Sequence, residues 1–185
     1  MIEPAVARRI KLVGFDVDGT LTDGGIYMGV SGGQQVELKR FDIQDGLGIH
    51  LLRAAGMPVV VITGRGGDAA RQRARELQVD EFVADTAARK LPAFEAILEK
   101  RQLRWEETCF IGDDLPDLPI LRRVALPVAV ANATKEVKES ARFTTTAAGG
   151  SGAVREFAEA FLKARGVWLD VVRTYLRERG DVTAR

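Results

Sequence analysis

The sequence has one cysteine, Cys109, among 185 residues, which excludes an internal disulfide and a zinc site built from several cysteines. Cys109 lies in the apolar run TCFIG, so we expect a small buried side chain rather than a reactive thiol. Neither sign of charge is in excess, because the chain has 27 Lys and Arg residues and 26 Asp and Glu residues. That balance gives no support for a nucleic-acid partner or a membrane surface.

Long hydrophobic runs are also missing. A membrane-spanning helix needs about 20 apolar residues in a row, and the longest runs here are far shorter. The apolar run after Arg8 and Arg9 leads straight into Asp16, which does not resemble a signal peptide. We therefore expect a cytoplasmic location. A hydrophobic content of 46% and a charged content of 29% are typical of a soluble globular chain.

Short apolar runs alternate with helical patterns along most of the chain. The predicted strands are 10–17, 58–63, 81–85, 108–112, 127–131 and 141–146. The predicted helices are 45–56, with Asp45 as its N-cap, and 67–78, 88–103, 114–124, 133–141 and 151–166. This alternation predicts an α/β fold with a doubly wound, mainly parallel sheet that is covered on both faces.

Two segments fall outside the alternation. Residues 26–30 and 35–41 flank the turn-forming stretch VSGGQ, which predicts a β-hairpin flap at about 25–41, after the first strand. We expect one domain over 1–166 and a helical tail over 167–185. The tail has an apolar stripe, which predicts packing on its own domain, and a partner subunit is the alternative. The stripe consists of Val167, Trp168, Val171, Val172 and Tyr175.

Polar residues gather where the predicted strands end. Ligands of open parallel sheets bind beyond the carboxyl ends of the strands, so these residues are the candidates for a site. They are Asp16 and Asp18 after the first strand, Thr63, Gly64 and Arg65 at the second, Asp113, Asp114 and Asp117 after 108–112, and Lys90 at the start of a helix.

This set of residues suits phosphoryl transfer. Asp16 and Asp113 offer the hard oxygen ligands that Mg²⁺ prefers. Thr63 and the backbone at Gly64 can donate hydrogen bonds to an anion, and Lys90 can neutralise charge on a phosphoryl group. Each residue alone has an ordinary structural explanation, such as a helix cap or a solvated lysine. Their joint occurrence in order at strand ends favours a catalytic site.

The same residues resemble the haloacid dehalogenase superfamily of phosphotransferases. Residues 16–20, DVDGT, match its first motif, and Thr63 and Lys90 match the second and third. Residues 112–117, GDDLPD, match the fourth. The resemblance implies a Rossmann-type sheet of that superfamily, an Mg²⁺ cofactor and phosphatase activity.

The resemblance also implies a role for each residue. Asp16 would be the nucleophile that forms an aspartyl-phosphate, and Asp18 would be the general acid and base. Mg²⁺ would be bound by Asp16, by Asp113 and by the backbone carbonyl of Asp18. Asp114 and Asp117 would support these metal ligands or Lys90. Thr63 would bind the phosphoryl group.

A narrower resemblance follows from the spacing of the motifs. Only the hairpin and one helix separate Thr20 from Thr63, so the chain lacks the cap domain of many superfamily members. The hairpin and the segments LTDGGIYM, KRFDIQDGLGIHLL, VVVITGR and AGGSGAVRE together are similar to the 3-deoxy-D-manno-octulosonate 8-phosphate (KDO 8-phosphate) phosphatases, which take part in lipopolysaccharide synthesis. That family implies a homotetramer, a sugar-acid phosphate substrate, and substrate contacts from Thr63, from 45–46 (Asp45, Gly46) and from 64–65 (Gly64, Arg65).

One difference and two alternatives stay open. The family often has arginine where this chain has Ser151, and Arg155 is the nearest arginine along the sequence. Phosphatases of nine-carbon sugar-acid 9-phosphates, such as sialic acid 9-phosphate or its deaminated analogue, would keep the same catalytic set. A non-catalytic oligomerisation module would not need Asp16, Asp18, Lys90 and Asp113 together.

Overall fold

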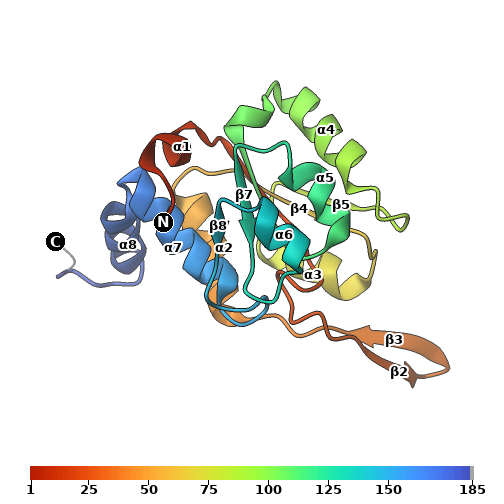
Figure 1. Cartoon of the computed structure of the whole chain (residues 1–185). Coiled ribbons are helices and arrows are strands. Elements are labelled where there is room, and N and C mark those ends of the chain that lie inside the picture. The colour runs from red at the N-terminus through yellow and green to blue at the C-terminus, as the bar shows by residue number, and fades with distance from the viewer. Residues whose placement is uncertain (184–185) are drawn as a thin grey trace.

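A computed structural model describes residues 1–183, and a six-stranded parallel sheet lies at its centre (Figure 1). The strand order is β5-β4-β1-β6-β7-β8. The strands are β1 (Leu12–Phe15), β4 (Val59–Thr63), β5 (Glu81–Ala84), β6 (Thr108–Gly112), β7 (Leu126–Ala129) and β8 (Phe143–Thr144). Every residue of β1, β4, β6 and β7 is buried, which explains their nearly unbroken apolar sequences.

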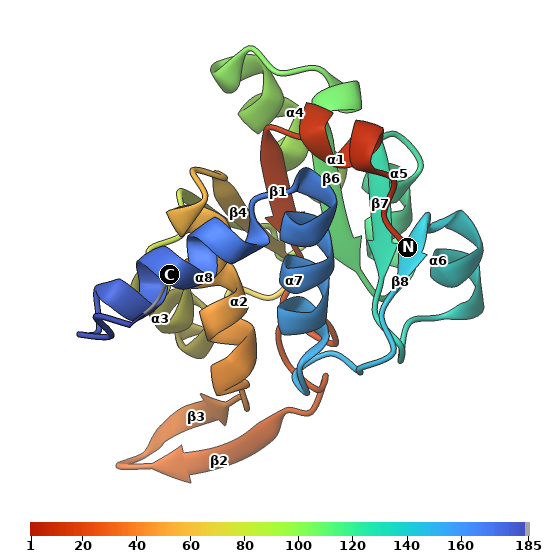
Figure 2. The same cartoon turned by 90° about the vertical axis from the view of Figure 1, so that its left-hand side faces the viewer.

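Helices cover both faces of the sheet. They are α1 (Pro4–Arg9), α2 (Ile43–Ala54), α3 (Asp68–Glu76), α4 (Lys90–Arg101), α5 (Leu118–Leu121), α6 (Lys135–Ser140), α7 (Ala153–Arg165) and α8 (Trp168–Arg177), with 3₁₀ turns η1 (Trp105–Glu107) and η2 (Leu115–Asp117). Helices α2 and α7 pack against each other, and α1 and α8 join them (Figure 2). Helices α4, α5 and α6 adjoin one another on the opposite face (Figure 1). The predicted α/β fold is confirmed.

The path of the chain creates a crevice between β1 and β6. From β1 the chain moves outward to β4 and β5, then returns to form β6 on the other side of β1. The carboxyl ends of β1 and β6 therefore flank the point where the strand order reverses. Ligands of doubly wound sheets bind at this point.

The predicted hairpin is confirmed as a separate two-stranded antiparallel sheet of β2 (Tyr27–Ser31) and β3 (Gln34–Leu38). It projects from the body of the molecule (Figures 1 and 2). Gly32 and Gly33 have φ angles of +58° and +79°, as a two-residue hairpin turn requires. The residues of β2 are all exposed.

Two local predictions need correction, and one helix was missed. Helix α2 begins at Ile43, and its N-cap is Asp42, whose side chain accepts hydrogen bonds from the backbone of Gln44 and Asp45. The predicted N-cap at Asp45 is therefore wrong. The predicted helix at 114–124 is a 3₁₀ turn followed by the short α5, and each contains a proline in its first turn. Helix α1 was not predicted, since six residues carry little periodic signal.

The C-terminal helix α8 packs on the body through α2 and α7. Val171 is buried, and the Trp168 ring lies against the cationic groups of Arg155 and Lys163. The apolar stripe thus contacts its own domain, as expected. Cys109 is buried, and burial raises the pKa of its thiol. Among residues 1–183, none of the helices has the length and apolar character needed to cross a bilayer.

Candidate active site

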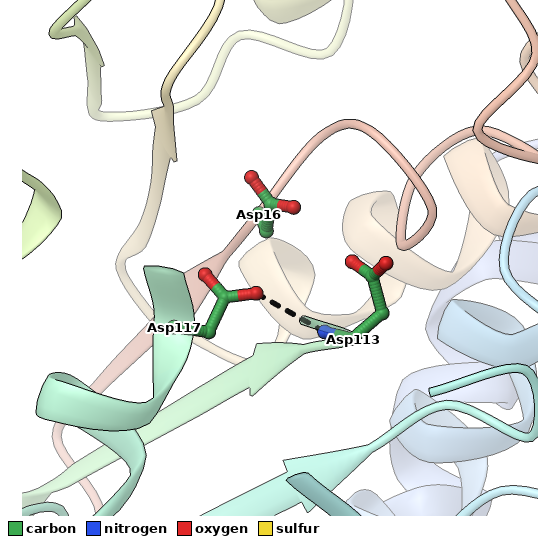
Figure 3. A group of neighbouring side chains, drawn as sticks. All are labelled: Asp16, Asp113 and Asp117. Atoms are coloured by element: carbon green, nitrogen blue, oxygen red, sulfur yellow. Dashed lines mark hydrogen bonds between the residues drawn. The ribbon is translucent and has the colours of Figure 1, made fainter. Parts of the chain in front are cut away.

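Three carboxylates meet at the crevice between β1 and β6. Asp16 directly follows β1, Asp113 directly follows β6, and Asp117 ends the 3₁₀ turn η2 (Figure 3). One oxygen from each carboxylate lies within 4.8 Å of the others. Parallel strands bring residues 97 positions apart, Asp16 and Asp113, to one edge of the sheet. The structure thus brings together three of the five acids that the sequence singled out.

Lys90 supplies a positive charge to this acidic cluster. It begins α4, and its ammonium lies 2.5 Å from Asp16 Oδ1 and 2.7 Å from Asp117 Oδ1. The Lys90 side chain is only 5% exposed. Burial lowers the pKa of Lys90, but the charges of Asp16 and Asp117 outweigh it and raise that pKa. Lys90 therefore stays charged and holds two of the three carboxylates.

One lysine does not balance three acids. Burial, followed by the charge of Asp117, raises the pKa of Asp16 well above its usual range even though Lys90 opposes this. Burial and Asp117 also raise the pKa of Asp113, to about 6. The raised pKa values show that the negative charges of these carboxylates are not fully balanced, so a further cation would stabilise their ionised forms. The oxygen-only donor set fits a hard divalent ion such as Mg²⁺.

Asp117 differs from the other two acids in how its oxygens are used. Its Oδ1 accepts a hydrogen bond from Lys90, and its Oδ2 accepts from the backbone N–H of Asp113 at 3.1 Å (Figure 3). Both oxygens are already bound by the protein. This geometry suits a residue that orients Asp113 and Lys90, with Asp16 and Asp113 left as candidate metal ligands. The Asp114 side chain instead caps η2 by accepting from the backbone of Leu115.

The loop after β1 is fitted closely to Asp113. Gly19 has a φ angle of +89°, and a β-carbon at this position would overlap the Asp113 carboxylate, so only glycine fits. The Thr20 hydroxyl donates to Asp113 Oδ1 at 3.0 Å. Asn132 fixes the same loop, because its amide donates to the Gly19 carbonyl and accepts from the backbone N–H of Gly149. Sequence reasoning did not identify Asn132.

Asp18 lies beside the cluster with a lysine of its own. Its Oδ1 is 2.6 Å from the ammonium of Lys39, which follows β3 of the hairpin. The Lys39 side chain has no exposed area, and the Asp18 side chain is 21% exposed. Sequence reasoning missed Lys39 and its neighbour Glu37. The available signal was their i, i+2 spacing, which places both on one face of the hairpin.

The end of β4 forms another wall of the site. A cleft of about 220 Å³ is lined by Asp16, Asp18, Gly64, Arg65, Ala88, Lys90, Asp113, Asp114, Pro116 and Asp117. The Arg65 guanidinium donates to Glu37 at 2.9 Å. Thr63 is buried, and its hydroxyl accepts from the backbone N–H of Arg65 at 3.0 Å. Thr63 thus shapes the turn beneath the cleft, and its contact with a phosphoryl group stays a prediction.

The other predicted substrate contacts lie away from the cleft lining. Asp45 is 2% exposed, and its carboxylate accepts hydrogen bonds from the backbone of Gly152 and Arg155 at the start of α7. Burial raises the pKa of Asp45. Gly46 is buried against the Arg73 guanidinium. These contacts explain both residues structurally, and their substrate contact stays a prediction.

The glycine-rich segment before α7 reaches the loop after β1. The backbone N–H of Gly150 donates to the Thr20 carbonyl at 3.2 Å, and Arg40 donates to the Gly150 carbonyl at 2.7 Å. Ser151 is exposed. The Arg155 guanidinium stacks on Trp168 of α8, 5.4 Å from the ring centre. Arg155 therefore contributes to the packing of the tail.

The chain matches known proteins over most of its length. The family model of haloacid dehalogenase-like hydrolases matches residues 82–157. The 3-deoxy-D-manno-octulosonate 8-phosphate phosphatase KdsC of Escherichia coli K12 is 40% identical over 162 residues, which cover 88% of this chain and 84% of that protein.

Solved structures agree with this match. The 3-deoxy-D-manno-octulosonate 8-phosphate phosphatase of Moraxella catarrhalis, in complex with a magnesium ion, a phosphate ion and KDO, is 34% identical with a TM-score of 0.86. The match covers 93% of this chain and 97% of that one. The enzyme of the same name from Yersinia pestis is 38% identical with a TM-score of 0.83, over 89% of this chain and 87% of that one.

Proposed function

This chain belongs to the haloacid dehalogenase superfamily and is a phosphatase of that type, and from this premise we propose that it hydrolyses KDO 8-phosphate. One observation carries the proposal: proteins named as phosphatases of this ester match most of the chain, at 40% identity over 88% of it for the Escherichia coli relative and at 34% identity over 93% of it for the Moraxella catarrhalis structure. The proposed products are the free sugar acid, a lipopolysaccharide precursor, and inorganic phosphate.

The proposed cofactor is Mg²⁺. Asp16, Asp113 and the backbone carbonyl of Asp18 would hold the ion, and Asp114 and Asp117 would support them. The crowded oxygen donors and the raised pKa values of Asp16 and Asp113 support this assignment. The solved relative with a magnesium ion and phosphate also supports it. When bound, the ion would offset the negative charge of the carboxylates and the phosphoryl group.

The first step of the proposed reaction transfers the phosphoryl group to the protein. A carboxylate oxygen of Asp16 forms a bond to phosphorus while the bond from phosphorus to the sugar oxygen breaks. Asp18 gives its proton to the leaving sugar oxygen. Lys90 is 2.5 Å from Asp16, which orients the nucleophile and favours its ionised form against the raising effects of burial and Asp117.

The second step releases phosphate. Asp18, now a carboxylate, takes a proton from water, and the water oxygen forms a bond to phosphorus while the bond to Asp16 breaks. Asp18 regains its proton and Asp16 its free carboxylate, so the cycle closes. The backbone of the 64–65 turn would donate to the phosphoryl oxygens, and Arg65 would contact the anionic end of the sugar acid.

We also propose that the active form is a homotetramer in the cytoplasm. Tyr27, Met28, Val30 and Leu38 of the hairpin are each 60–74% exposed, and exposed apolar side chains at this density support a partner surface. A chain with one buried cysteine is compatible with a reducing compartment.

The test is phosphate release from a panel of eight- and nine-carbon sugar-acid phosphates, with Mg²⁺ and with a chelator. We expect the highest kcat/KM for KDO 8-phosphate and loss of activity in the chelator. Equal or higher kcat/KM for a nine-carbon ester would overturn the substrate assignment. Absence of metal-dependent release from every ester would favour the oligomerisation module.

A further inference from the structure

The side chain of Lys39 is buried beside a hairpin whose strands are mostly exposed. Lys39 directly follows β3 of the hairpin. The other hairpin strand, β2, is exposed along its whole length. The side chain of Lys39 nevertheless has no exposed area. Burying a lysine ammonium is costly unless a carboxylate pairs with it. The hairpin therefore places this charge at the site for a specific partner.

That partner is Asp18. The Lys39 ammonium lies 2.6 Å from Asp18 Oδ1 and 3.5 Å from Glu37 Oε1. The shorter distance is a strong charge-assisted hydrogen bond. The longer one is not a hydrogen bond, since Glu37 Oε1 is buried without any such partner in the part of the chain described. The other Glu37 oxygen binds Arg65 at 2.9 Å.

Each aspartate of the DVDGT segment thus has its own lysine, and the two lysines come from different elements. Lys90 of α4 binds Asp16, and Lys39 of the hairpin binds Asp18. Oδ1 of Asp18 accepts a hydrogen bond from the Lys39 ammonium. A proton on Asp18 would then lie on Oδ2, because Oδ1 already accepts from the ammonium.

We propose that Lys39 is a positioning residue, which fixes the Asp18 carboxylate so that Oδ2 carries the proton in both steps. This inference rests on the proposed function, since it gives Asp18 the acid and base roles described above. It also makes turnover depend on the hairpin. A misplaced acid or base loses much of its rate advantage while substrate binding is retained.

The test compares K39M with K39R on two esters. For KDO 8-phosphate we expect K39M to lower kcat roughly tenfold or more, with a KM within about threefold of the unaltered chain. Lys39→Arg keeps the cation, so it should recover part of the lost kcat. Thermal unfolding of both variants identifies any loss of fold.

An activated ester distinguishes a loss of Asp18 positioning from a nonspecific loss of activity. The leaving group of 4-nitrophenyl phosphate needs no protonation, so the first-turnover burst of nitrophenolate should survive in K39M. Steady-state turnover of the same ester should fall, because hydrolysis of the aspartyl-phosphate at Asp16 still requires Asp18 as the base. The matched control is R40M, which removes the adjacent cation and its bond to Gly150 without touching Asp18. Its burst and steady-state rates should change by one common factor.

Two results would overturn the inference while leaving the proposed function intact. One is a K39M variant whose kcat on KDO 8-phosphate equals that of the unaltered chain. The other is a K39M variant whose burst and steady-state rates fall by the same factor, as R40M is expected to show. An unaltered chain that releases no phosphate from either ester would overturn the proposed function itself, and this inference with it.

Discussion

Lys90 and Lys39 bind neighbouring aspartates that have different proposed tasks. Asp16 is buried beside Asp113 and Asp117, where a phosphorus atom and a cation would meet. Asp18 is more exposed and faces the hairpin. Asp16 directly follows β1, and Asp18 stands two residues later at the start of the sharp loop that Gly19 permits with its φ angle of +89°.

Replacing Asp18 should trap the proposed intermediate. Asp18→Asn removes the base for the second step, while 4-nitrophenyl phosphate needs no acid in the first. We expect the variant to accumulate one phosphoryl group on the peptide that contains Asp16, as read by mass spectrometry after an acid quench. An Asp16→Asn, Asp18→Asn double variant is the control, and a phosphoryl group on it would contradict the assignment of the nucleophile.

The metal-free protein should become more stable as the pH falls from about 7 toward 5. The pKa of Asp113 in the folded state is about 6, above its ordinary 3.8. The folded state therefore binds more protons than the unfolded state between these values, so stability is lost as pH rises through 6. Chemical denaturation in chelator measures this trend. Asp113→Asn should flatten it and stabilise the metal-free chain at pH 7; an unchanged slope would contradict the argument.

At the scale of elements, the start of α7 depends on a side chain from α2. Asp45 accepts hydrogen bonds from the backbone of Gly152 and Arg155, and it is buried. Asp45→Ala would leave those donors unpaired, so we expect a loss of about 2 kcal/mol in the free energy of unfolding. Urea denaturation measures it, with Asp42→Ala, the N-cap of α2, as a comparison. An unchanged stability would contradict this structural role of Asp45.

The sequence predicted the sheet, the hairpin and the residues at the strand ends, because buried parallel strands leave a strong apolar signal. It misplaced the start of α2, since Asp42 and Asp45 are both plausible caps and only the fold shows that Asp45 points to α7. It also missed Lys39 and Asn132. Their roles depend on where a hairpin and a distant loop lie in space. The i, i+2 spacing of Glu37 and Lys39 places both on one face of the hairpin, but it does not place that face at Asp18.

At the scale of the whole molecule, the exposed hairpin predicts self-association. We expect a tetramer in sedimentation at micromolar concentration, and Val30→Lys should weaken it because a charge would enter an apolar contact. Val30 is 74% exposed, so the substitution should leave the stability of the single chain unchanged. A monomer of the unaltered chain at working concentration would contradict the prediction.

The most direct test of the account is phosphate release from KDO 8-phosphate by the unaltered chain and by Asp16→Asn, both with Mg²⁺. The asparagine keeps the shape of the site but cannot form an aspartyl-phosphate. We predict steady release by the unaltered chain and a rate lower by a factor of roughly 1,000 or more for the variant. An Asp16→Asn variant with near-full activity, or an unaltered chain that releases no phosphate, would contradict the account.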